Sequence, residues 1–183
     1  MMSDVDNIAM MILKQVLQEA QDEWIDPDSK YKEYRNLQID KRGSFGERFF
    51  AQTLSQIYVR RLKIEYNDGD QGDWDLKFND VKFEIKTSSI TVKSKTFQNE
   101  GIKEDGDYAG ILFLGVKPNQ LLIKFVLKSE IPFETLHNRK KAGTGSGYKW
   151  DFKEKDMIKV KSLDDIKQEF DKNFNFLLNK KIK

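Results

Sequence analysis

The segment from Gly72 to Ser89, GDWDLKFNDVKFEIKTSS, alternates apolar and charged residues on either side of a central Asn-Asp pair. A period of two residues is typical of a β-strand with one buried face, and an Asn-Asp pair favours a tight two-residue turn. The segment therefore predicts an antiparallel hairpin in which Phe78 faces Val81. This register fixes every facing pair farther from the turn, because a slip of one residue would exchange the two faces of the hairpin.

The predicted register sorts the side chains of the hairpin into an apolar face and a charged face. The apolar face consists of Trp74, Leu76, Phe78, Val81, Phe83 and Ile85. The charged face consists of Asp73, Asp75, Lys77, Lys82, Glu84 and Lys86. We expect the apolar face to pack in the core, whereas the charged face could simply be a solvated surface.

One facing pair on the charged face argues for more than a solvated surface. The register places Asp75 opposite Glu84, and like charges that face each other across a hairpin are destabilising. Two carboxylates at that separation repel unless one takes up a proton or a cation lies between them. Magnesium is typically held by one or two carboxylates with waters and phosphate oxygens, so the pair is a candidate Mg²⁺ site. Lys86 lies on the same face and could steady an attacking water or the charge that builds on a phosphate.

The spacing of these charged residues is also that of a known motif. The pattern D-x8-E-x-K, from Asp75 to Lys86, resembles the motif of the PD-(D/E)xK nuclease superfamily, which has the restriction-endonuclease-like fold. The flanking segments WDLKF and VKFEIKTSS, the later DYAGILFLGV and a basic loop are similar to type II restriction endonucleases in particular. The resemblance covers roughly residues 43–150, and Trp74 stands where the family motif has a proline.

The resemblance implies a role for each residue of the motif. Asp75, Glu84 and the carbonyl of Ile85 would hold Mg²⁺, and Lys86 would orient the attacking water. Glu47, in a preceding helix, matches in kind a further acid of the family that assists or binds a second ion. The implied protein is a type II restriction endonuclease that cuts double-stranded DNA as a homodimer whose symmetry matches its site.

Other interpretations of the same residues stay open. Glu47 could instead close a capping box with Ser44 at the start of its helix. The chain could be a structure-specific nuclease of the same fold that acts in DNA repair or junction resolution. It could also be a catalytically inactive DNA-binding module, or a protein-interaction domain with a charged strand face.

Candidate DNA contacts lie after the motif and in a glycine-rich basic loop from His137 to Lys149. Lysines bind phosphates, whereas Arg139 and Asn138 can make bidentate contacts to bases. The full set of candidate contacts is Thr87, Ser88, Lys93, Lys95, Gln98, His137, Asn138, Arg139, Lys140, Lys141 and Lys149. The alternative for the loop is a flexible, solvated segment. The loop does not fit G-x-x-x-x-G-K-[ST], so we expect no nucleotide cofactor.

The remaining pattern predicts helices before and after a central block of strands along the chain. Helices are expected at Asp4–Trp24, Ser44–Arg60 and Leu163–Leu178, strands at Leu62–Tyr66, Ala109–Val116 and Gln120–Leu127, and an irregular segment at Thr91–Asp107. This order favours an α/β (α+β) fold, a restriction-endonuclease-like core with a mixed β-sheet flanked by helices. We expect one nuclease domain over 1–183, with a helical segment at 1–40, the catalytic core at 41–150 and a strand and helix at 151–183.

Composition excludes several classes of protein. The 183 residues include no cysteine and a single histidine, which removes thiolate zinc sites and histidine-paired metal motifs. The absence of cysteine fits a reducing cytoplasm, so we expect a cytoplasmic protein. The longest apolar runs are too short to span a bilayer, which needs about 20 residues, so no membrane partner is expected. The net charge of +2 gives no global basic field, so DNA binding must depend on local charge.

Overall fold

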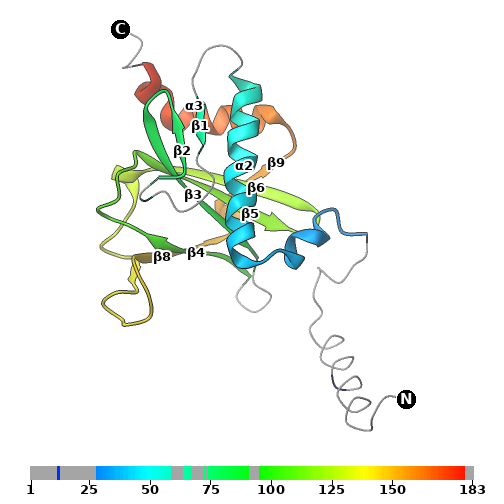
Figure 1. Cartoon of the computed structure of the whole chain (residues 1–183), viewed down its shortest axis with the longest axis vertical. Coiled ribbons are helices and arrows are strands. Elements are labelled where there is room, and N and C mark those ends of the chain that lie inside the picture. The colour runs from blue at the N-terminus through cyan, green and yellow to red at the C-terminus, as the bar shows by residue number, and fades with distance from the viewer. Residues whose placement is uncertain are drawn as a thin grey trace.

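The computed structural model describes most of the chain (Figure 1). It covers residue 12 and residues 28–58, 64–66, 72, 74–90 and 95–179. The helix expected at Asp4–Trp24 lies outside the described residues except for Ile12, and Asp73 and Lys93 lie outside them as well.

Among the described residues, six strands form a mixed sheet in the order β1-β2-β3-β5-β6-β9. All neighbouring strands are antiparallel except β3 and β5, which are parallel. A smaller antiparallel sheet has the order β4-β8-β7. The strands are β1 (Ile64–Tyr66), β2 (Leu76–Phe78), β3 (Val81–Ser89), β4 (Thr96–Ile102), β5 (Gly110–Lys117), β6 (Gln120–Leu127), β7 (His137–Asn138), β8 (Tyr148–Lys153) and β9 (Ile158–Val160). The helices are α2 (Ile39–Ile57) and α3 (Leu163–Asn179), with short 3-10 turns η2 (Lys32–Asn36), η3 (Lys128–Glu130) and η4 (Glu154–Asp156).

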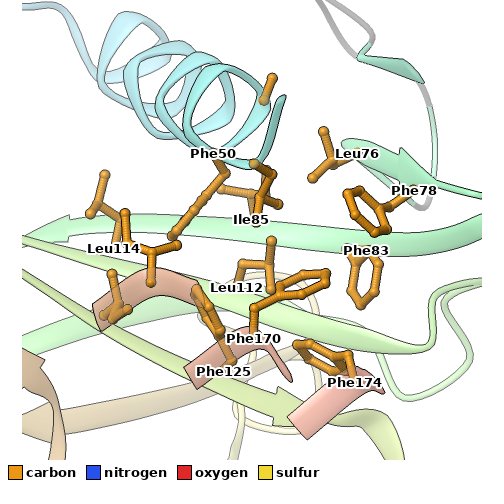
Figure 2. Packing of buried hydrophobic residues seen from close by; sticks show 14 of the residues in the cluster. Phe50, Leu76, Phe78, Phe83, Ile85, Leu112, Leu114, Phe125, Phe170 and Phe174 are labelled. Carbon is orange, nitrogen blue, oxygen red and sulfur yellow. The ribbon is translucent and has the colours of Figure 1, made fainter. Parts of the chain in front are cut away.

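The two faces of the large sheet pack against different layers. Alternate residues of β5 divide between them: Leu112 and Leu114 join the core formed with α2 and α3, and Phe113 joins the core formed with the small sheet. Figure 2 shows Phe50 of α2 and Phe170 of α3 in the first of these cores. The molecule therefore has helices on one face of a mixed sheet and a second sheet on the other face, which confirms the predicted fold class.

The predicted hairpin is confirmed. Asn79 and Asp80 have φ angles of 47° and 65°, and two positive φ values in succession are the conformation of a type I′ turn. Phe78 pairs with Val81, and the ladder ends two residues farther along, at the pair of Leu76 and Phe83. The apolar face between these limits is buried as expected.

Trp74 is an exception to the predicted faces. We expected its side chain in the core opposite Ile85, but the indole lies 5.9 Å from the Lys77 Nζ and 6.0 Å from the Lys82 Nζ, on the charged face. The backbone bends at Asp75 once the ladder has ended, so the alternation of faces does not extend to Trp74. The ring helps to offset the repulsion between two facing lysines through cation–π contacts.

Three predicted boundaries are wrong. Helix α2 begins at Ile39 and not near Ser44, because its first turn is exposed and carries no apolar periodicity. The segment predicted to be irregular contains β4, whose period-two pattern is broken by a bulge between Asn99 and Ile102. The basic loop is shorter than predicted, because both of its ends belong to the strands β7 and β8.

The predicted strands β5 and β6 and the C-terminal helix are confirmed. No helix within the described ranges has the length and hydrophobicity needed to cross a membrane.

Candidate active site

Asp75 is held against β3 just beyond the end of the β2–β3 ladder. Its backbone amide donates to the Phe83 carbonyl at 2.9 Å, and its carboxylate Oδ2 accepts a hydrogen bond from the Ile85 amide at 2.7 Å. Both the main chain and the side chain of Asp75 are therefore fixed by the strand that carries Glu84. The bend that displaces Trp74 keeps the Asp75 carboxylate beside that strand.

Glu84 and Lys86 lie on the face of β3 that is turned toward the small sheet. They are the parallel neighbours of Ile111 and Phe113, which are both buried between the two sheets. The Glu84 side chain is 14% exposed, and its Oε1 lies 2.5 Å from the Lys86 Nζ. The structure thus brings the acid and the lysine of the motif into direct contact in a largely desolvated position.

Burial raises the pKa of the Glu84 carboxyl above its ordinary value. The positive charge of Lys86 opposes this effect, the negative charge of Asp75 adds to it, and the positive charge of Lys103 opposes it more weakly. Asp75 is therefore close enough to Glu84 for the two carboxylates to repel. The charged form of Glu84 is costly here unless further positive charge is brought to the pair.

The donor atoms at this point suit a hard divalent cation. The N–H and C=O groups of one strand residue point to the same edge of the strand, so the Ile85 carbonyl lies on the edge where its amide binds Asp75. Two carboxylates and a carbonyl are the oxygen ligands that magnesium prefers, with waters and substrate oxygens completing the shell. In the described part of the chain, no three acidic, histidine or cysteine side chains gather into a metal centre. Within the described ranges, Asp75 and Glu84 would therefore be its carboxylate ligands.

Glu47 lies within α2 and not at its start. The N-cap of the helix is Gln38, so the capping box with Ser44 is excluded. The Glu47 Oε1 lies 3.7 Å from the position that a Cβ would occupy at Gly43, one turn earlier in the same helix. Glu47 is half-buried beside the point where α2 meets β3, but it is not grouped with the two motif acids.

Thr87 occupies the opposite face of β3 from Glu84 and Lys86. A Cβ at Gly46 would lie 1.8 Å from the Thr87 Oγ1, so only glycine permits this approach of α2 to the strand. The Oγ1 atom is buried and makes no hydrogen bond. The predicted contact of Thr87 with DNA is therefore wrong, because alternation along the strand turns its hydroxyl into the helical layer.

We expect Thr87→Val to raise the free energy of unfolding by about 1 kcal/mol, since a buried hydroxyl without a partner costs roughly 1–3 kcal/mol. Urea denaturation would measure the change. The matched control is Thr53→Val, because the Thr53 Oγ1 donates to the Phe49 carbonyl at 2.8 Å and its loss should destabilise the protein. Equal destabilisation by both variants would show that the Thr87 hydroxyl has a partner.

The small sheet supplies residues that sequence reasoning missed. Asn99 of β4 is buried, and its amide nitrogen donates to the Phe97 and Trp150 carbonyls at 3.2 Å. Its Oδ1 accepts a hydrogen bond from the Ser88 Oγ at 3.1 Å, which ties the end of β3 to β4. The only available signal was the period of two from Phe97 to Asn99. That signal is too short to indicate a strand. Lys103, whose positive charge acts weakly on Glu84, was also not predicted, because it belongs to no motif.

In the folded structure, acidic partners offset part of the positive charge of the basic loop. The Arg139 guanidinium is bound by the Glu100 carboxylate and the Thr144 carbonyl, and the Lys149 Nζ lies 3.4 Å from Asp151. The Asn138 Oδ1 accepts from the Lys141 amide at 2.9 Å. The side chains predicted to read bases are thus held by partners within the small sheet and its loop, and their contact with bases stays a prediction.

Several predicted DNA contacts remain accessible. His137, Lys140 and Lys141 are exposed on the β7–β8 hairpin, Lys95 is exposed at the start of β4, and Gln98 is half-buried on that strand. These side chains lie on the small sheet and its loops, the layer that faces Glu84 and Lys86.

Comparison with known proteins gives little further information. The sequence matches no family model, and no curated protein is similar to it. Among solved structures, the chain is similar to a bacterial homing endonuclease, I-Ssp6803I, with 13% sequence identity and a TM-score of 0.41. The similarity covers 64% of this chain and 76% of the homing endonuclease. At that level of similarity, the function of this chain has to be inferred from its own residues.

Proposed function

We propose that the protein is a divalent-metal-dependent DNA endonuclease of the PD-(D/E)xK superfamily with a restriction-endonuclease-like core. The observation that carries the proposal is the convergence of Asp75, Glu84 and Lys86 at one point of β3. There the Ile85 amide fixes one acid, and Lys86 contacts the other in a desolvated position. A solvated strand face would not need two repelling carboxylates in a position that disfavours the charge of one of them.

Each residue of the site has a defined task in phosphodiester hydrolysis. Asp75, Glu84 and the Ile85 carbonyl would hold magnesium, which when bound supplies Lewis acidity and a water of lowered pKa. The hydrogen bond from the Ile85 amide to Asp75 orients that carboxylate before substrate arrives. The Lys86 ammonium, already beside Glu84, holds positive charge where an attacking water and a phosphate oxygen would meet.

The finer form of the proposal is a type II restriction endonuclease of the cytoplasm that cuts a short duplex sequence as a homodimer. Residues 41–150 would form the catalytic core of a single domain, with 1–40 and 151–183 as its helical and strand–helix flanks. The exposed Lys140 and Lys141 would bind phosphates of double-stranded DNA. Magnesium would be the physiological metal, because the donor atoms are all oxygens.

We expect wild-type protein with Mg²⁺ to convert plasmid DNA into discrete fragments, and we expect an excess of EDTA to abolish cleavage. Gel electrophoresis followed by sequencing of the ends would show whether the cuts fall at one short sequence. Smears, or cutting confined to branched DNA, would favour a structure-specific nuclease instead. Salt-dependent binding without cutting would indicate an inactive DNA-binding module, and neither binding nor cutting would refute the proposal.

A further inference from the structure

Lys103 has a fixed main chain and an exposed side chain. It directly follows Ile102, the last residue of β4, which is fully buried between the sheets. The hydroxyl of the buried Tyr108 donates a hydrogen bond to the Lys103 carbonyl. The lysine side chain itself is exposed. The backbone therefore presents the ammonium group from an anchored position.

The same turn lies against β3 beside the motif. The Ala109 amide donates to the Lys82 carbonyl at 2.8 Å, which returns the chain after β4 to the strand that carries Glu84. Gly101, at the β4 bulge with a φ of +70°, brings the backbone so close that a Cβ there would lie 3.9 Å from the Lys86 Nζ. The main chain two residues before Lys103 thus lies against the lysine of the motif.

A cleft of about 670 Å³ begins at Lys103. Its opposite wall is the β7–β8 hairpin, including Lys140 and the backbone of Gly147. The acids Glu104 and Asp105 also line it, and the Tyr148 hydroxyl donates to Glu104 at 2.8 Å. The cleft therefore lies between Lys103 and the exposed Lys140 of the hairpin.

We propose that Lys103 is a phosphate-binding residue of the site and contacts the DNA phosphodiester that lies over Glu84 and Lys86. The inference rests on the proposed nuclease function and deepens it. A phosphate that approaches two carboxylates needs more than one positive charge, and the Lys86 ammonium is already engaged with Glu84. Lys103 supplies that second charge from an exposed position at the mouth of the cleft.

The test compares Lys103→Met and Lys103→Arg with the control Lys155→Met. Lys155 is an exposed lysine of η4, which follows β8 at the opposite end of its pairing with β4. We expect Lys103→Met to lower kcat/KM for plasmid cleavage by roughly 10-fold to 100-fold, the loss of one charged hydrogen bond. Duplex binding would be measured in EDTA at several salt concentrations. The slope of log Kd against log salt concentration should fall by about 0.9, the value that corresponds to one phosphate contact. Lys103→Arg should retain both values within a few-fold, and Lys155→Met should match wild type.

The two measurements separate the inference from the function on which it rests. If Lys103→Met equals Lys155→Met in both cleavage and salt slope, the role of Lys103 is refuted and the nuclease function stands. If wild type itself cuts no DNA, the nuclease function fails, and the salt slope alone decides whether Lys103 contacts phosphate.

Discussion

Replacing Glu84 or Lys86 by alanine is expected to lower Mg²⁺-dependent DNA cleavage by roughly 10²–10⁴-fold, the range for losing a group that acts on the reacting atoms. Glu84→Ala removes one of the two carboxylates that would hold the metal. Lys86→Ala removes the ammonium group whose Nζ lies 2.5 Å from the Glu84 Oε1. DNA binding should survive in both variants, because most of the proposed phosphate contacts lie on the small sheet. Single-turnover cleavage of plasmid DNA would measure the loss, and fluorescence anisotropy would measure binding.

The control for this pair is Glu130→Ala, which removes an exposed acid in η3. Its cleavage rate should equal that of wild type. Full cutting by either Glu84→Ala or Lys86→Ala would show that the site is wrongly assigned, whatever the fold.

The largest effect on stability is expected for Phe170→Ala, which should cost about 3–5 kcal/mol in the free energy of unfolding. Phe170 is fully buried and lies beside Phe78 and Phe83 (Figure 2). Its ring centroid lies 5.2 Å from that of Phe78, 5.6 Å from that of Phe83 and 5.8 Å from that of Tyr58. The ring therefore joins α3 to both strands of the hairpin and to the end of α2. Its removal leaves a cavity under the strands that position the two acids.

Urea denaturation of Phe170→Ala beside Leu163→Ala would measure this effect. Leu163 begins the same helix but is 40% exposed, so its truncation should cost far less than that of Phe170. A similar, small loss for both variants would mean that the aromatic core does not hold the hairpin to α3.

The hairpin was predictable from the sequence because its determinants are local. Alternation sets which side chains are buried, and the Asn79-Asp80 turn sets the register, so the pairing of Leu76 with Phe83 follows without any tertiary information. The relation of Glu84 to Lys86 is equally local, because residues two apart on a strand share a face.

The features that the sequence did not reveal depend on contacts between distant segments. The position of Trp74 depends on where β2 stops pairing, which alternation alone does not mark. The face of β3 that receives α2 holds Thr87 on the opposite side from Glu84 and Lys86, and the close approach of Gly46 is evident only once the two elements are side by side. Gly101 of β4 lies against Lys86 because the small sheet folds over β3, a proximity with no counterpart in motif spacing.

The shared metal site of Asp75 and Glu84 is tested most directly by a crystal structure of the protein with Mn²⁺ in place of Mg²⁺, analysed by anomalous scattering. We expect an anomalous peak bound by the carboxylates of both Asp75 and Glu84, with the Ile85 carbonyl on the same side. A peak bound elsewhere, or no peak at this pair in protein that cuts DNA with Mn²⁺, would contradict it.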